Sequence, residues 1–169
     1  ELDEECIELF LEKGAWLMPT MKVKLDWPDL DEELIRRKDI FEFKGISLKE
    51  KEANRLIHVF KMAYDKGVKI AMGSDTYCNE KTPYGEFTLS EIKLFVKRAG
   101  LDIFETLKAA TRYSAEALGI SDKVGTLECG KFADIIILDK DITKNIDSLC
   151  KENINKIIKE GRLINLKNK

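Results

Sequence analysis

The sequence lacks any apolar run approaching the about 20 residues that a membrane-spanning helix requires, and no signal peptide is visible. It also lacks an excess of charge of one sign, because 29 Lys and Arg residues stand against 31 Asp and Glu residues. Neither sign gathers into long blocks. The charge pattern therefore does not predict binding to nucleic acid or to an acidic membrane surface.

Cysteine is sparse and scattered. The four cysteines, Cys6, Cys78, Cys129 and Cys150, form no C-x-x-C pair, which argues against structural zinc and against a redox dithiol. A disulfide framework is not required either, since 169 residues of which 44% are hydrophobic can build a core without cross-links. Free thiols suit a reducing compartment, and we expect a cytoplasmic protein on this ground.

Histidine is represented only by His58. A catalytic zinc usually has three protein ligands, with imidazole well represented among them. His58 lies in the middle of a predicted helix and flanks its apolar stripe, which favours a surface or packing role over metal ligation. A thiol nucleophile built from Cys78 and His58 is a poor alternative, because the two residues fall on different predicted elements. Metal chemistry would need ligands from elsewhere.

The apolar periodicity predicts an α/β fold with parallel strands. The expected elements are a helix from Asp3 to Gly14, a strand over 15–20, a long helix from Ser47 to Gly67, a strand over 68–72, and helices over 88–99, 102–110 and 114–118. The charged residues 22–45 are expected to form an irregular connection with a short helix near 31–37. Thr88 and Glu91 match a capping box. Two strands cannot close such a layer, which indicates part of a barrel or sheet.

The character of the sequence changes near Ser121, where the helical pattern gives way to a tail of strands. Residues 133–138 are rich in β-branched side chains. Residues 156–159 and 162–165 flank Glu160-Gly161 and predict a hairpin.

Asp75 is the strongest candidate for chemistry. It follows the predicted strand 68–72 after Gly73 and Ser74, and reactive groups in parallel α/β folds gather at the carboxyl ends of strands. A carboxylate there can ligate a divalent metal and accept a proton from metal-bound water. An aspartate that caps the loop by bonding neighbouring amides explains the spacing equally well.

Four further residues are candidates for a substrate pocket because they lie at or beyond the predicted strand ends: Thr20, Tyr77, Asn79 and Tyr84. Polar residues at such positions are also common as solvated turn formers.

Three stretches together resemble a known family: Leu17 to Thr20, Gly67 to Asp75 and Val124 to Asp134, with Ala109-Ala110-Thr111 before the last. They are similar to the C-terminal part of the amidohydrolase superfamily, most closely its imidazolonepropionase-like and prolidase-like members. The resemblance covers nearly the whole chain. Gly-Ser-Asp alone is a short motif, but its order with Gly-Lys-x-Ala-Asp about 55 residues later is fairly specific.

The resemblance implies a (β/α)8 barrel of the TIM type and a small β-sandwich. Residues 1–120 would supply the seventh strand (15–20) and the eighth (68–72), and residues 121–169 would supply sandwich strands. Asp75 matches the metal-binding aspartate of the family, which also acts as the proton-shuttling base. The resemblance also implies a divalent metal, zinc in particular, and a small amide or peptide substrate.

The chain departs from the family in its ligands. The His-x-His pair of the first strand, the lysine or acidic residue of a middle strand and the two later histidines have no counterpart, and Tyr84 stands where many relatives carry histidine. The sequence also begins at Glu1 without an initiator Met, as a piece of a longer protein would. We therefore expect a C-terminal fragment of a metal-dependent amidohydrolase that hydrolyses amide, cyclic amide or dipeptide C–N bonds and is inactive alone.

Two other functions remain open. One is a stand-alone interaction or structural module derived from such a barrel, with self-association through exposed strand edges. The other is a deaminase of the same superfamily, in which Asp75 would do similar work. An upstream reading frame encoding a His-x-His strand would favour the enzyme over the module.

Overall fold

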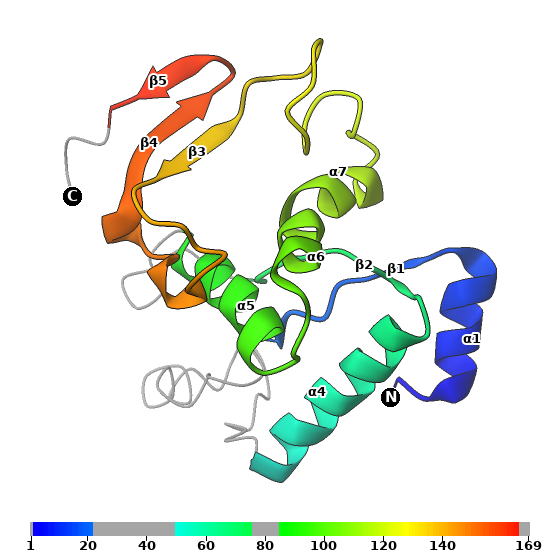
Figure 1. Ribbon diagram of the computed structural model, residues 1–169. Helices are drawn as coiled ribbons and strands as arrows, with labels where there is room; N and C mark the ends of the chain where they lie inside the picture. Colours follow the sequence, from blue (N-terminus) through cyan, green and yellow to red (C-terminus); the bar gives the residue numbers. More distant parts are fainter. Residues whose placement is uncertain (1, 22–49, 76–84, 166–169) are drawn as a thin grey trace, which may run out of the picture.

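The structure is a computed structural model that describes residues 2–21, 50–75 and 85–165. The predicted irregular connection, its short helix and the Ser47 cap lie outside these residues. The described elements are α1 (Glu4–Lys13), β1 (Trp16–Leu17), α4 (Glu50–Asp65), β2 (Lys69–Ile70), α5 (Glu86–Lys97), α6 (Ile103–Lys108), the π-helical turn η2 (Ala109–Tyr113), α7 (Ser114–Ala117), β3 (Ile135–Leu138), the 3-10 turns η3 (Ile146–Ser148) and η4 (Lys151–Asn153), β4 (Ile154–Lys159) and β5 (Arg162–Ile164). None of the described helices is long and apolar enough to cross a membrane. The result is a mixed α/β structure (Figure 1).

The first helix has the ends that its sequence predicts. The Asp3 carboxylate accepts a hydrogen bond from the Cys6 amide at 2.9 Å, which satisfies one of the unpaired donors of the first turn. Gly14 ends α1 in the left-handed conformation, with φ at 60°. Between these caps Ile7 is fully buried, so α1 is fixed both by its ends and by its apolar face.

The core lies between α4, α5 and the two parallel strands. Phe60 of α4 and Phe95 of α5 are buried, and their ring centroids lie 4.9 Å apart in a tilted arrangement. Val68 and Ile70 of the β2 segment join the same cluster. Burying each such side chain contributes about 1.5–3 kcal/mol, so this cluster is the main source of stability for the region that carries the strand ends.

Strands β1 and β2 pair in parallel, with Trp16 opposite Lys69 and Leu17 opposite Ile70. The Ala71 amide extends the pairing by donating to the Leu17 carbonyl at 3.0 Å. Both strands are shorter than the predicted 15–20 and 68–72. β1 cannot continue as a regular ladder because Pro19 has no N–H to donate and Thr20 has a positive φ of 43°.

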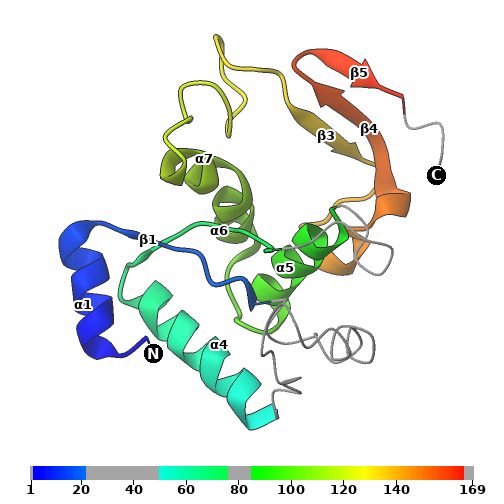
Figure 2. The same cartoon turned by 180° about the vertical axis from the view of Figure 1, so that it is seen from behind.

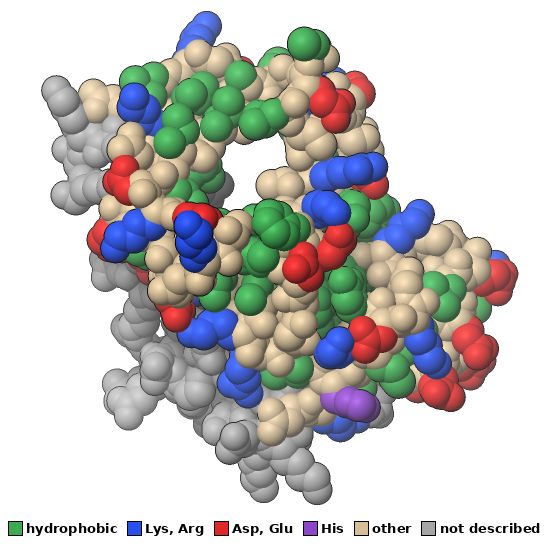
Figure 3. Space-filling model, viewed as in Figure 1, with side chains coloured by type: hydrophobic (Ala, Val, Ile, Leu, Met, Phe, Trp, Pro, Cys, Tyr) green, Lys and Arg blue, Asp and Glu red, His purple; other side chains and the backbone are tan. Residues whose placement is uncertain are grey.

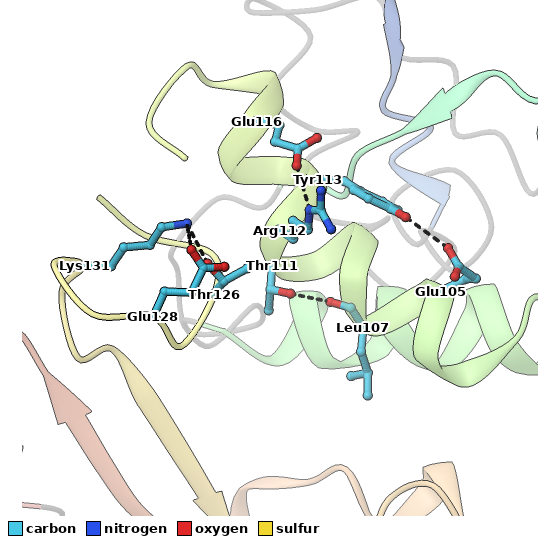
Figure 4. A network of polar contacts seen from close by, with 9 residues as sticks. All are labelled: Glu105, Leu107, Thr111, Arg112, Tyr113, Glu116, Thr126, Glu128 and Lys131. Atoms are coloured by element: carbon cyan, nitrogen blue, oxygen red, sulfur yellow. Dashed lines mark hydrogen bonds and ion pairs between the residues drawn. The ribbon is translucent and has the colours of Figure 1, made fainter. Parts of the chain in front are cut away.

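The helices predicted over 102–110 and 114–118 are present as α6 and α7, but no break separates them. The π-helical turn η2 joins α6 to α7. The Thr111 hydroxyl donates to the Leu107 carbonyl at 2.7 Å (Figure 4). The Ser114 hydroxyl donates to the Ala109 carbonyl at 2.6 Å. These hydroxyls engage carbonyls of the preceding turns and accompany the wider π-helical winding.

The predicted hairpin is confirmed. β3, β4 and β5 form an antiparallel sheet in that order. The β4–β5 turn has φ of 52° at Glu160 and 76° at Gly161, as a type I′ turn requires. Asp134 holds this turn by accepting from the Glu160 amide at 2.7 Å and from Lys159 Nζ at 2.6 Å. The bonds from Lys159 and the Glu160 amide lower the pKa of the Asp134 carboxyl.

The antiparallel sheet carries apolar side chains on both faces. Its cross-strand register aligns Ile136, Ile157 and Ile164 in one row, and Ile135, Ile158 and Leu163 in the next, on the opposite face. Ile136 is 59% exposed and Leu163 is 65% exposed. Figure 3 shows hydrophobic side chains gathered over this sheet and an opening between it and the segment after α7.

The segment between α7 and β3 packs against the helices through Gly125. A Cβ at Gly125 would meet Ala115 Cβ at 2.7 Å and the Thr111 carbonyl oxygen at 3.2 Å, and its φ is 97°. Beyond it, Lys131 Nζ bonds the Thr126 hydroxyl at 2.6 Å and lies 3.3 Å from the Glu128 carboxylate (Figure 4). Lys131, which belongs to the Gly-Lys-x-Ala-Asp motif at residues 130–134, therefore stabilises the fold of this segment.

We predict that Gly125→Ala destabilises the chain much more than Gly130→Ala. Both glycines have a positive φ, but only Gly125 lacks room for a methyl group, whereas nothing lies within 4 Å of a Cβ at Gly130. We expect Gly130→Ala to cost about 1 kcal/mol and Gly125→Ala at least about 2 kcal/mol more. Urea unfolding of the two variants measures this, and equal losses would contradict the packing argument.

We predict that Asp134→Asn lowers the melting temperature near pH 7 and that its difference from the unsubstituted chain disappears as the pH falls. The folded pKa of Asp134 is below its unfolded value, so its contribution to stability is present above the unfolded pKa and is lost as the pH falls through the folded pKa. Melting curves between about pH 7 and about pH 3 test this. Asp122→Asn, at an exposed turn position, is the control.

Candidate functional site

The parallel pairing of β1 and β2 places the carboxyl ends of both strands at one edge. Thr20 follows β1 and Asp75 follows β2, so the pairing brings these two predicted site residues to the same end of the sheet. Gly73 lies close to Met18, since a Cβ on Gly73 would stand 2.4 Å from the Met18 sulfur. The absence of a side chain at Gly73 thus allows the two strand ends to approach each other.

Asp75 is exposed, and its backbone is in the left-handed region with φ of 48°. Aspartate tolerates this conformation better than most residues, though it is uncommon. The amides that a capping aspartate would use follow it in the chain and lie outside the described residues. An exposed carboxylate at a strand end can accept a proton or bind a cation.

Thr20 has a φ of 43°, which is rarer still, because β-branched residues seldom adopt positive φ. It is half-buried. Two residues with positive φ therefore follow the two adjacent strands. Backbone strain of this kind costs about 1–3 kcal/mol per residue and persists only where the surrounding contacts hold it.

Ser114 anchors the end of β2. Its hydroxyl oxygen accepts from the Met72 amide at 3.0 Å and lies 2.6 Å from the Ala109 carbonyl and 3.2 Å from the Met72 carbonyl. A hydroxyl has one proton, and the Ala109 carbonyl is the closer acceptor. The π-helical turn therefore fixes the segment that leads to Asp75.

Glu91 is the residue that the sequence analysis misinterpreted. α5 begins at Glu86, with Gly85 as a cap that has no side chain, so the predicted capping box of Thr88 and Glu91 was wrong. Glu91 is fully buried, and its carboxylate accepts from the Met21 amide at 2.6 Å. Its place one turn before the buried Phe95, on the core-facing side of α5, was the available signal.

The other sequence candidates either lie outside the described residues or stand on another element. Tyr77, Asn79, Tyr84 and Cys78 lie outside the described residues. His58 is exposed on α4, as its position beside the apolar stripe predicts, and Figure 3 shows it on the surface.

The described residues do not by themselves fit a metal ion. Within residues 2–21, 50–75 and 85–165 there is no group of three or more His, Cys, Asp or Glu side chains that could hold one. Asp75 offers one oxygen ligand, whereas a catalytic zinc usually requires three protein ligands.

Comparison with solved structures identifies relatives over nearly the whole chain. A Xaa-Pro dipeptidase with bound methionine matches with a TM-score of 0.71 and 28% identity, covering 96% of this chain and 37% of that chain. The ochratoxinase of A. niger matches with a TM-score of 0.72 and 26% identity, covering 95% of this chain and 34% of that one. The chain thus spans little more than a third of these relatives.

Sequence relatives agree with the structural ones. The imidazolonepropionase of Mesorhizobium japonicum is 41% identical over 73 residues, which is 43% of this chain and 17% of that protein. That of Symbiobacterium thermophilum is 35% identical over 99 residues, which is 58% of this chain and 23% of that protein. The resemblance to imidazolonepropionase-like and prolidase-like proteins is confirmed. Since residues 2–164 match the Amidohydrolase family, the chain belongs to that family.

Proposed function

We propose that this chain is the C-terminal part of a metal-dependent hydrolase that cleaves C–N bonds. On this proposal, residues 1–120 are the C-terminal part of a (β/α)8 barrel, and β1 and β2 are its seventh and eighth strands. Residues 121–169 contribute strands to a small β-sandwich. The Xaa-Pro dipeptidase among the relatives supports a dipeptide-like substrate, and the imidazolonepropionases support a small cyclic amide.

The observation that carries the proposal is the placement of Asp75. It is an exposed carboxylate with a positive φ that follows one of two adjacent parallel strands, and the Ser114 hydroxyl bonds the Met72 amide three residues before it. In parallel α/β folds this edge is where reactive groups gather. We infer from this placement that Asp75 takes part in a reaction.

The chemistry we assign to Asp75 is proton transfer. A water oxygen attacks the amide carbonyl carbon and gives one proton to the Asp75 carboxylate. The protonated carboxyl then delivers that proton to the amide nitrogen as the C–N bond breaks, which leaves an acid and an amine. General acid–base transfer by one positioned carboxylate contributes about 10²–10⁴-fold to such a rate.

The metal is a separate part of the proposal. A divalent ion, zinc in particular, would need further ligands, because the described residues contain no group of three or more His, Cys, Asp or Glu side chains that could hold it. No step assigned to Asp75 above depends on how that ion is held.

We predict that Asp75→Asn abolishes most of the hydrolysis. The natural reading frame that encodes this chain, expressed with whatever coding sequence adjoins it, should hydrolyse a Xaa-Pro dipeptide or a cyclic amide. Asp75→Asn should lower its kcat by about 10²–10⁴-fold, because the amide cannot accept the proton, with little change in KM. Asp122→Asn, at an exposed turn, is the matched control. A variant at position 75 that keeps nearly full kcat would exclude the proton-acceptor role.

We predict that residues 1–169, purified alone and dialysed against buffer with trace zinc, retain much less than one equivalent of the metal. The reason is that the described residues contain no group of three or more metal-binding side chains, and one carboxylate binds zinc weakly. Elemental analysis by mass spectrometry measures the content. Tight equimolar zinc in this chain, lost on Asp75→Asn, would show that the ligands are present within it and would contradict the need for ligands from elsewhere.

A further inference from the structure

We propose that Glu91 is a positioning residue that holds the turn after β1 in place beside Asp75. The contact between Glu91 and Met21 stands by itself, whereas its effect on hydrolysis rests on the proposed function. Glu91 lies on α5 and is fully buried. Its carboxylate accepts a hydrogen bond of 2.6 Å from the amide of Met21, which lies 70 residues earlier in the sequence. A buried carboxylate is costly without hydrogen-bond partners, and the Met21 amide supplies one of them.

Glu91 stands among apolar residues on the core-facing side of α5. Its neighbours on the helix, Ile92 and Phe95, are buried apolar residues of the core. A leucine of similar size would fill the space and bury more apolar surface. What a leucine would not supply is an acceptor for the Met21 amide, which would then lose its partner in a buried position.

The bond acts on a strained piece of backbone. Met21 is 3% exposed and directly follows Thr20, whose φ is 43°. The side chain of Met21 is held in the core while its amide is held by Glu91, so the backbone is fixed on the carboxyl side of Thr20. Such fixation from the surroundings is what a β-branched residue with positive φ requires.

The same helix also reaches the second strand end. Thr88 lies one turn before Glu91, and its hydroxyl is 3.3 Å from the Ser74 hydroxyl, directly before Asp75. In Figures 1 and 2 the traces that follow β1 and β2 both run to α5. One helix therefore bonds both segments, and it sets where Thr20 stands relative to Asp75.

The test measures the Met21 amide by NMR in residues 1–169. We expect Glu91→Leu to accelerate hydrogen exchange of this amide at least about tenfold, while the Ala71 amide, bonded across the strands, changes little. Glu91→Gln keeps an acceptor and should restore most of the protection, but should shift the Met21 amide resonance more than any amide of β2. Glu86→Gln is the control, since the Glu86 carboxylate on the same helix pairs with Lys151.

Unchanged exchange and an unchanged Met21 resonance in Glu91→Gln and Glu91→Leu would overturn the inference. If Glu91→Leu does not fold, the resonance shift in Glu91→Gln decides alone. In the hydrolysis assay, Glu91→Leu should raise KM more than it lowers kcat, because Thr20 is expected to line the substrate pocket. A fall in kcat at constant KM would also overturn the inference. Absence of hydrolysis in the unsubstituted protein would instead refute the proposed function and leave the exchange result standing.

Discussion

The site depends on a short stretch of parallel backbone pairing. Trp16 and Leu17 align with Lys69 and Ile70, and the Ala71 amide adds one further bond to Leu17. This pairing is too short to be stable by itself, because a two-stranded sheet needs packing on its faces. The apolar cluster of α4, α5 and the β2 segment supplies that packing. The relative positions of Thr20 and Asp75 follow from this arrangement, since each stands only a few residues beyond the paired segment.

The caps of α1 and the hairpin turn between β4 and β5 could be predicted from the sequence because their causes are local. Asp3 and Gly14 bound α1 through contacts within a few residues, and Glu160-Gly161 specify the hairpin through their own backbone preferences. The edge position of Asp75 could be predicted because a strand pattern directly precedes it. These features need no knowledge of what lies far away in the chain.

The features that sequence patterns missed have distant causes. Glu91 matched a capping box with Thr88, and only the fold shows that each side chain instead bonds a different strand end. Ser114, which directly follows the π-helical turn, bonds the Met72 amide 42 residues earlier in the chain. Residues with two plausible partners, one local and one remote, are therefore where local interpretation fails, and here they border the candidate site.

The tail sheet extends this argument to what surrounds the site. Both faces of this sheet carry rows of apolar side chains, and Ile136 and Leu163 are more than half exposed. A sheet with one solvent-exposed face would instead alternate apolar with polar residues along each strand. Gly125 and Asp134 fix this sheet to the helices and close its hairpin, so its geometry is set even though its faces are not fully covered. Within the Gly-Lys-x-Ala-Asp stretch, residues 130–134, Lys131 bonds the Thr126 hydroxyl and Asp134 closes the hairpin turn, so two members of this stretch contribute to the fold.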